Sequence, residues 1–270
     1  MIATKEMIAV PGGRVACDVA GTGPLVVLSP GMGDVRSSYR FQFDALVNAG
    51  YRVVAVDLRG HGDSDATFTS YGDEATSADL VAVIAHFGGP AVIVGNSMSA
   101  GAAVLAAARE PHAVRGLVLV GPFVRDPQSS ALQRLMMKVV MAKPFIAASW
   151  NAYLPKLFAG RTPVDFDDYR QTVKNALSRP GYRAAFAATM TTSHASADAA
   201  LATVLAPSLV VMGELDPDFS SPLDEAMWIG SMLSGRVEMI ADAGHYPHAQ
   251  QPEVFNALLL DFLVGAVPRG

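Results

Sequence analysis

Short apolar runs that alternate with helix-patterned segments are the feature that most constrains the fold of this chain. Such alternation needs crossover helices, which join the parallel strands of a single sheet. The runs are apolar almost throughout, which is typical of strands that are covered on both faces. We identify six of them, at 25–28, 52–56, 91–94, 116–120, 208–212 and 237–240.

Two further runs precede these six and complete the expected sheet. Residues 7–10 and 14–19 flank Pro11, Gly12 and Gly13, a combination that is typical of an antiparallel hairpin. The sequence therefore predicts an α/β fold with a mostly parallel, eight-stranded sheet that is flanked by helices.

Three of the predicted helices have clear boundaries. Between residues 80 and 87, apolar side chains recur at i, i+3, i+4 and i+7, and this helix is expected to end before Gly88. A closing helix is expected to begin at Pro252, because proline is favoured at the first helical position. A third helix, capped by Ser37 or Ser38, is expected to end at Gly50.

The alternation breaks down between residues 123 and 205. This interval shows helical patterns and no convincing buried strand. It is rich in methionine and aromatic residues, among them Met136, Met137, Met141, Trp150 and Phe158. We therefore expect a helical cap inserted at 123–205 and a core that consists of 1–122 and 206–270.

Charge and hydropathy exclude several classes of protein. The net charge is −5 and lysine and arginine form no run, so a nucleic-acid partner is not expected. Residues 1–10 lack the apolar run of a secretory signal. The apolar stretch 255–267 is too short to span a bilayer and carries Asn256 and Asp261. We therefore expect a cytoplasmic protein without a membrane span; the oligomeric state stays open.

The segment 92–101 has the chemistry of a nucleophile elbow. An apolar run leads into Gly95, Ser97 and Ser99 and then into an alanine-rich helix. A serine at such a turn is held above the sheet in a strained conformation, and small residues are needed two positions before and after it. Gly95 and Ser99 meet this requirement for Ser97. The N-terminus of the following helix favours an oxyanion, and the backbone amide of Met98 is the natural donor.

The elbow pattern leaves two alternatives open. The last position of the G-x-S-x-G pattern is occupied by Ser99 and not by glycine. If the pattern is shifted by two residues, Ser99 becomes the nucleophile and Gly101 occupies the last position. This shift moves the hydroxyl into the helix, away from the end of the strand, so Ser97 is preferred. The other alternative is a tight strand-to-helix connection without chemistry.

Four motifs along the chain occur in the order of one enzyme family. They are DLRGHGDSD at 57–65, GNSMS at 95–99, GELDPDF at 213–219 and AGHYPHAQQP at 243–252. With these motifs the chain resembles the α/β-hydrolase superfamily over nearly its whole length, and within it the serine hydrolases of carboxylesterase type. The resemblance implies the α/β-hydrolase fold with an inserted cap, a catalytic triad and no cofactor.

The resemblance also implies the partners of Ser97. His245 matches the catalytic base, in a loop after the last predicted strand. Asp216 matches the acid that holds the histidine in the correct tautomer. Asp218 and Glu214 are near neighbours that compete for this role, and Asp126 is a further alternative.

A second oxyanion donor is implied in the loop after the run 25–28. It is the backbone amide of Met32, which follows Gly31. The family commonly has a histidine where this chain has Pro30. The loop must therefore be anchored by a different hydrogen bond.

The remaining histidines are interpreted as structural. His61 in the GHG loop is expected to form a structural hydrogen bond, and His248 to be a local or pocket-rim contact. His86, His112 and His194 are interpreted as ordinary helix or surface residues. No pair of histidines or carboxylates has convincing metal-ligand spacing, so we expect no catalytic metal.

A serine nucleophile restricts the expected chemistry to acyl transfer. Epoxide hydrolases and haloalkane dehalogenases need a carboxylate at the elbow, because they attack an alkyl carbon. We expect hydrolysis of a small apolar carboxylic ester or lactone through an acyl-serine intermediate. Carbon-carbon bond hydrolases of dienoates and cofactor-free perhydrolases use the same triad and remain alternatives, and a non-catalytic small-ligand receptor is an alternative of another class.

The methionine and aromatic side chains of the cap either line an apolar acyl pocket or form the cap's own core.

Overall fold

The computed structural model, which describes residues 3–126 and 145–266, contains one eight-stranded sheet. Its strands are Thr4–Val10 (β1), Gly13–Ala20 (β2), Leu25–Ser29 (β3), Arg52–Val56 (β4), Ala91–Asn96 (β5), Val114–Val120 (β6), Ser208–Gly213 (β7) and Arg236–Ile240 (β8). Their order is β1-β2-β4-β3-β5-β6-β7-β8. Only the pairs of β1 with β2 and of β2 with β4 are antiparallel. The predicted α/β fold with a mostly parallel sheet is confirmed.

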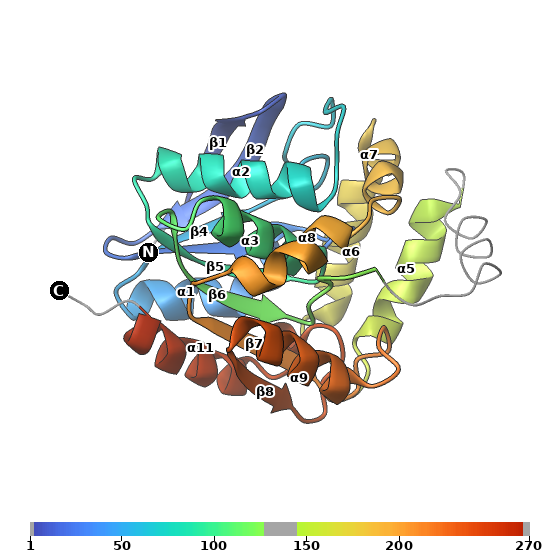
Figure 1. Ribbon diagram of the computed structural model, residues 1–270. Helices are drawn as coiled ribbons and strands as arrows, with labels where there is room; N and C mark the ends of the chain where they lie inside the picture. The colour runs from blue at the N-terminus through green and yellow to red at the C-terminus, as the bar shows by residue number, and fades with distance from the viewer. Residues whose placement is uncertain (1–2, 127–144, 267–270) are drawn as a thin grey trace.

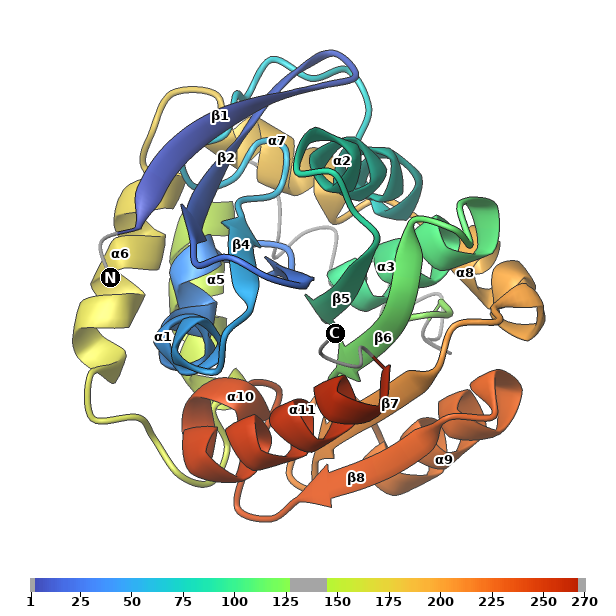
Figure 2. The ribbon, with the colours of Figure 1, turned by 90° about the vertical axis from the view of Figure 1, so that its left-hand side faces the viewer.

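Helices cover both faces of the sheet (Figure 2). They are Arg36–Tyr39 (the 3-10 helix η1), Arg40–Asn48 (α1), Asp73–His86 (α2), Met98–Arg109 (α3), Pro222–Leu233 (α9), Pro247–Gln250 (α10) and Pro252–Ala266 (α11). On one face, α2, α3 and α9 bury Leu80, Val104 and Ile229 in a common apolar cluster with the strands. On the other, α1 and α11 bury Leu46 and Phe255. The two-sided burial explains why the strands are apolar almost throughout.

The parallel strands bring the predicted site residues to one edge of the sheet. In the strand register, Ser29 at the end of β3 pairs with Gly95, and Asn96 at the end of β5 pairs with Val120 of β6. The loops that follow β3, β5, β6, β7 and β8 therefore leave the sheet side by side. In α/β sheets, this carboxyl edge is where ligands bind.

One helix begins later than the sequence indicated, and its predicted caps are wrong. Ser37 and Ser38 lie inside η1, where the amide of Ser38 donates to the carbonyl of Val35 at 2.9 Å. This i to i−3 bond defines a 3-10 turn, so the serines are part of the turn and do not precede it. The α-helix α1 starts only at Arg40, and no side chain caps it. The other two predicted boundaries, the end of α2 before Gly88 and the start of α11 at Pro252, are confirmed.

In its described residues, the interval between β6 and β7 contains helices joined by loops, and no strand. It contains Ile146–Leu157 (α5), Phe166–Leu177 (α6), Tyr182–Thr189 (α7), Ala195–Ala200 (α8) and Leu201–Thr203 (η2). Helices α5, α6 and α7 stand beyond the carboxyl ends of the strands (Figure 1) and share a buried cluster that includes Trp150, Tyr169 and Phe186. Helix α8 packs instead against α3.

The division into a core of 1–122 and 206–270 and a cap at 123–205 stays a proposal. Three methionines on which the cap prediction drew, Met136, Met137 and Met141, lie outside the described residues. Within residues 3–126 and 145–266, no helix is both long and apolar enough to cross a membrane.

Candidate active site

The turn between β5 and α3 has the strained backbone of a nucleophile elbow. Ser97 has φ 57° and ψ −124°, a conformation that residues with a side chain rarely adopt. A Cβ atom on Gly95 would lie 2.5 Å from the carbonyl oxygen of Ser99, so a residue without a side chain is needed there. The turn thus places Ser97 between the end of β5 and the N-terminus of α3.

The alternative nucleophile, Ser99, is buried and its hydroxyl is engaged. It donates a 2.5 Å hydrogen bond to the carbonyl of Pro30 and lies 2.9 Å from the hydroxyl oxygen of Ser29. These bonds favour Ser97 over Ser99 as the nucleophile. The bond from Ser99 to the carbonyl of Pro30 also anchors the loop after β3. It is the different hydrogen bond that the sequence predicts for a loop with proline at this position.

The loop after β3 runs directly past Ser97. A Cβ atom on Gly31 would lie 2.9 Å from the Cβ of Ser97, so glycine allows the close approach. In the described part of the chain, the amides of Met32 and Met98 donate to no other group of the protein. The two predicted oxyanion donors are therefore free to bind a ligand.

Helix α5 bonds to the site at two points. The indole Nε1 of Trp150 donates to the carbonyl of Gly33 at 2.8 Å. The amide of His245 donates to the carbonyl of Leu157 at 2.7 Å. The proposed cap thus contacts both the loop after β3 and the loop that carries the predicted base.

Asp216 and His245 form a buried acid–base pair. Nδ1 of His245 lies 2.7 Å from Oδ2 of Asp216, and both side chains are buried. Oδ1 of Asp216 accepts a hydrogen bond from the amide of Asp218 at 3.0 Å. An ionised carboxylate only accepts, so Nδ1 carries a proton and Nε2 is the free base of the neutral ring.

The alternative acids are placed less well than Asp216. Oδ2 of Asp218 is 3.8 Å from Nδ1 of His245, beyond hydrogen-bond distance, and its other oxygen accepts from the hydroxyl of Tyr153. The side chain of Glu214 is exposed. Asp126 accepts hydrogen bonds from residues just before α8. None of the three holds the imidazole.

Ser97 and His245 are both tied to the strand ends next to them. The side-chain amide of Asn96 donates to the carbonyl of His245 at 3.2 Å and to that of Val120 at 3.0 Å. The amide of Ser97 donates to the same carbonyl of Val120 at 2.9 Å. Among the described residues, however, the hydroxyl of Ser97 forms no hydrogen bond with His245. Such bonds often form only when substrate closes the site.

The carboxylate beside His245 makes the imidazole more basic. Burial lowers the pKa of His245, but the charge of Asp216 and the hydrogen bond to it outweigh burial and raise the pKa above the ordinary 6.5. By residue type alone, a histidine base is expected to titrate near neutrality.

We therefore expect kcat/KM to rise with pH through a limb that lies above pH 6.5. Only the neutral imidazole accepts the serine proton, and the raised pKa delays its deprotonation to higher pH. The measurement is kcat/KM against pH for the wild-type protein, over the range in which a melting curve shows that it stays folded. A limb at or below 6.5 would contradict the influence of Asp216 on the base.

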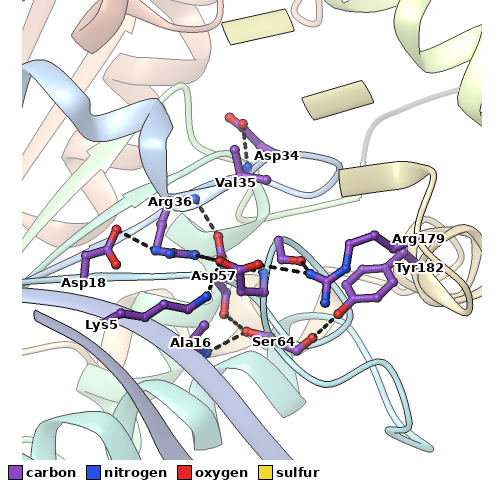
Figure 3. Close-up of polar contacts among 12 residues, drawn as sticks. Lys5, Ala16, Asp18, Asp34, Val35, Arg36, Asp57, Ser64, Arg179 and Tyr182 are labelled. Atoms are coloured by element: carbon purple, nitrogen blue, oxygen red, sulfur yellow. Dashed lines mark hydrogen bonds and ion pairs between the residues drawn. The ribbon is translucent and has the colours of Figure 1, made fainter. Parts of the chain in front are cut away.

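The DLRGHGDSD motif forms a charged network beside the site (Figure 3). Asp57 is buried against the guanidinium of Arg36, whose backbone amide also donates to Oδ1 of Asp57 at 2.7 Å. Arg36 pairs with Asp18 at 2.7 Å and with Asp63 at 3.0 Å, and Arg179 pairs with Asp63 at 3.2 Å. The network joins β2 and the loops after β3 and β4 to the segment between α6 and α7, so the motif has a structural role.

Two histidines of the motifs have the local roles expected of them. Nδ1 of His61 lies 3.0 Å from the carbonyl oxygen of Arg59. His248 is fully buried and stacks on Tyr39 with 4.6 Å between the ring centres, so it is a local contact and does not lie on a rim.

The interpretation of His194 as an ordinary helix or surface residue is wrong. The start of α8 carries its buried ring against α2, where Nδ1 lies 2.8 Å from Oδ2 of Asp73. The sequence does not reveal this pair, because the two residues are far apart along the chain. His86 and His112 are exposed, as expected.

One group in the described residues brings three possible metal ligands within 4.8 Å of one another. It consists of Asp216, Asp218 and His245. Two of its members share the 2.7 Å hydrogen bond of the acid–base pair, and the third accepts from Tyr153. Assays with a chelator will test the expectation that no metal takes part.

Comparisons with known proteins identify the family of the chain. A sequence model of the alpha/beta hydrolase family matches residues 26–258. A 2-hydroxy-6-oxononadienedioate/2-hydroxy-6-oxononatrienedioate hydrolase of Burkholderia vietnamiensis is 28% identical over 93% of this chain and 91% of its own length. A pimeloyl-(acyl-carrier protein) methyl ester esterase of Neisseria meningitidis is 31% identical over 84% of this chain and 90% of its own. The solved structure of a thermophilic esterase from Thermogutta terrifontis is 25% identical, with a TM-score of 0.77 over 98% of this chain and 99% of that one. The chain therefore belongs to the alpha/beta hydrolase family.

Proposed function

We propose that the protein hydrolyses a small, uncharged carboxylic ester or lactone through an acyl-serine intermediate. Ser97 is the nucleophile, His245 the general base and then acid, and Asp216 the carboxylate that orients His245. The backbone amides of Met98 and Met32 bind the oxyanion. The reaction needs no cofactor.

The strained backbone of Ser97 is the observation that carries this proposal. A positive φ is costly at serine, and at Ser97 it is combined with ψ −124°, outside the left-handed helical region in which Ser234 ends α9. An acyl carbon bonded to Ser97 would hold its oxygen beside the N-terminus of α3, where the amide of Met98 is free. A serine at this position also disfavours epoxide hydrolysis, which requires a carboxylate nucleophile.

The buried acid–base pair supplies the proton transfers. Nε2 of His245 accepts the proton of Ser97 as Oγ attacks the carbonyl carbon, and Asp216 stabilises the imidazolium through Nδ1. His245 then gives the proton to the leaving alkoxide, and the carbon–oxygen bond of the ester breaks. A water molecule, deprotonated by the same Nε2, attacks the acyl carbon. The bond from this carbon to Oγ breaks, the imidazolium returns the proton to Oγ of Ser97, and the acid is released.

The charges near His245 favour a neutral substrate. Asp216 and Asp218 are the groups whose charges most raise the pKa of the imidazole, and both are carboxyls. A substrate with a carboxylate at this point would meet a negative potential. The dienedioate named for the Burkholderia relative is such a substrate. Carbon-carbon hydrolysis and perhydrolysis therefore remain second to ester or lactone hydrolysis.

A substrate series on the wild-type protein tests the proposal. The series contains aryl esters of increasing acyl length, a lactone and a dienoate, each with and without EDTA. We expect turnover of esters or lactones, no effect of EDTA, and an optimum at acyl chains of roughly two to six carbons. Each methylene should add at most about 0.8 kcal/mol until the pocket is full. The fastest turnover on the dienoate would establish the carbon-carbon alternative, and binding without turnover of any compound would establish the receptor.

Two cap residues provide a matched pair of variants for the same series. Both side chains belong to the cap's buried cluster. Trp150 also bonds to Gly33 of the loop after β3, whereas Phe158 stacks on Tyr246 with 4.6 Å between the ring centres. Trp150→Ala should move the acyl optimum. Phe158→Ala should lower the free energy of unfolding by about 3–5 kcal/mol and leave the optimum in place. A shift in Phe158→Ala alone, or equal rates at every length, would contradict a pocket bounded by Trp150.

A further inference from the structure

A small cavity between α6 and two loops is lined by Asp34 and His61, two titratable residues that the proposed mechanism does not use. It offers about 10 Å³ to the centre of a water molecule, which is room for about one water. Gly33 and Asp34 line it from the loop after β3, residues 60–62 from the loop after β4, and Val173 and Leu177 from α6.

Asp34 has one carboxyl oxygen that is satisfied and one that is not. Oδ1 accepts hydrogen bonds from the hydroxyl of Tyr169 and, at 2.6 Å, from the amide of Val35. Oδ2 is buried and accepts no hydrogen bond of ordinary geometry among the described residues. The hydroxyl of Tyr246 lies near the carboxyl, and burial together with this contact raises the pKa of Tyr246. In Figure 3 the carboxyl points away from Asp57, so the charged network around Asp57 does not satisfy it. A buried carboxylate in this state is costly, whereas a protonated carboxyl needs only an acceptor for Oδ2–H.

His61 supplies the complementary acceptor on the same cavity. Its Nδ1 faces the carbonyl oxygen of Arg59, which only accepts, so Nδ1 carries the ring proton. Burial lowers the pKa of His61 to about 4, so the ring is neutral near pH 7. Its Nε2 is then a lone-pair acceptor, and this buried atom has no partner in the part of the chain that the structure describes.

The surroundings of Asp34 favour its neutral form. Burial raises the pKa of Asp34 to about 7, against the opposing hydrogen bonds of Tyr169 and Val35 and the charge of Arg40. The charge of Arg40 is shared with Asp165, to which it bonds at 2.5 Å. The titratable and charged groups that face Asp34 are Tyr39 of η1, Arg40 of α1, Asp57 and His61 after β4, Tyr169 of α6, and His245 and Tyr246 after β8.

We propose that Asp34 is a positioning residue whose carboxyl, while protonated, donates Oδ2–H through one buried water to Nε2 of His61. The bridge joins the loop that carries the amide of Met32 to the loop after β4, and the hydrogen bond from Tyr169 to Oδ1 of Asp34 joins the same loop to α6. Asp34 thus acts through the oxyanion loop and does not touch the reacting atoms. The neutral state also spares His245 one of the negative charges that raise its pKa. The catalytic part of this proposal rests on the proposed function; the protonation and the bridge do not.

The pH dependence of the melting temperature tests the protonation. An unfolded aspartate titrates near 3.8 and the folded Asp34 near 7, so the folded protein binds the extra proton and loses stability as the pH rises between these values. Asp34→Asn keeps the shape and removes the titration. The Tm of wild type relative to Asp34→Asn should fall by about 2–5 °C per pH unit between pH 4 and 7 and then level off. Parallel Tm curves would overturn the proposal, whatever the activity of the protein.

The kinetics of a small set of variants test the positioning. Asp34→Leu should lower kcat by about 10- to 100-fold with little change in KM, because a misplaced oxyanion donor weakens the transition state more than the ground state. Asp34→Asn should recover most of this loss, since its amide N–H replaces Oδ2–H. His61→Leu should reproduce the loss, and the double variant Asp34→Leu/His61→Leu should be no worse than either single one. Additive losses, or no recovery in Asp34→Asn, would overturn the bridge. If wild type turns over no ester while the Tm result holds, only the proposed function fails.

Discussion

Replacement of Ser97 by alanine should lower kcat on the best ester or lactone by about 10⁴-fold or more, because the members of a triad act as a unit. The variant lacks the only atom that forms the acyl bond, so no partial route through an acyl-serine remains. The fold should be unaffected, since the hydroxyl of Ser97 makes no hydrogen bond in the described residues. Relief from the strained φ is not expected either, because alanine carries the same Cβ. The measurements are single-substrate kinetics and a melting curve.

Ser99→Ala is the matched control for this variant. It removes a hydroxyl two residues away that anchors the loop after β3 through Pro30. We expect a far smaller loss of kcat than in Ser97→Ala, together with a lower melting temperature, because a buried hydrogen bond is lost. The reverse order of the two kcat values would assign the nucleophile to Ser99.

Replacement of Asp216 by asparagine should be the second-largest loss, about 10⁴-fold in kcat. The amide cannot stabilise imidazolium, and its N–H group favours the wrong tautomer of His245 by donating to Nδ1. Burial then dominates the pKa of His245, so the residual kcat/KM should titrate at lower pH than in wild type. Kinetics against pH for the two proteins measure both effects.

Asp218→Asn separates this role from a general effect of negative charge. Asp218 lies 3.8 Å from Nδ1 of His245 and also raises the pKa of the imidazole, but it does not hold the ring. Its replacement should lower the pH limb and leave most of kcat. If Asp218→Asn loses more kcat than Asp216→Asn, the acid of the triad is Asp218.

The sheet and the elbow could be predicted because both follow from short-range patterns. All eight strands contain the apolar runs from which they were predicted, since two-sided burial in a parallel sheet requires continuous apolar sequence. The strain at Ser97 is likewise forced by its neighbours: Gly95 has no room for a Cβ atom, and α3 begins one residue after the serine.

The features that could not be predicted depend on contacts between distant residues. Pro30 showed only that the usual anchor of its loop is missing; the hydroxyl of Ser99 supplies it from α3. The unsatisfied oxygen of Asp34 cannot be recognised from the sequence, because its burial depends on the contact with α6. The predicted cap at Ser37 or Ser38 is wrong for a different, local reason: a serine that caps a helix and a serine inside a 3-10 turn can have the same neighbours in sequence.

Covalent labelling tests the central claim, that Ser97 is an activated nucleophile, most directly. The wild-type protein is treated with a fluorophosphonate, digested, and the modified residue is located by mass spectrometry. We expect one adduct per chain, on Ser97, with loss of hydrolytic activity in proportion to labelling; Ser97→Ala should take up no label. An adduct on Ser99, or full hydrolytic activity in a protein that takes up no label, would contradict this claim.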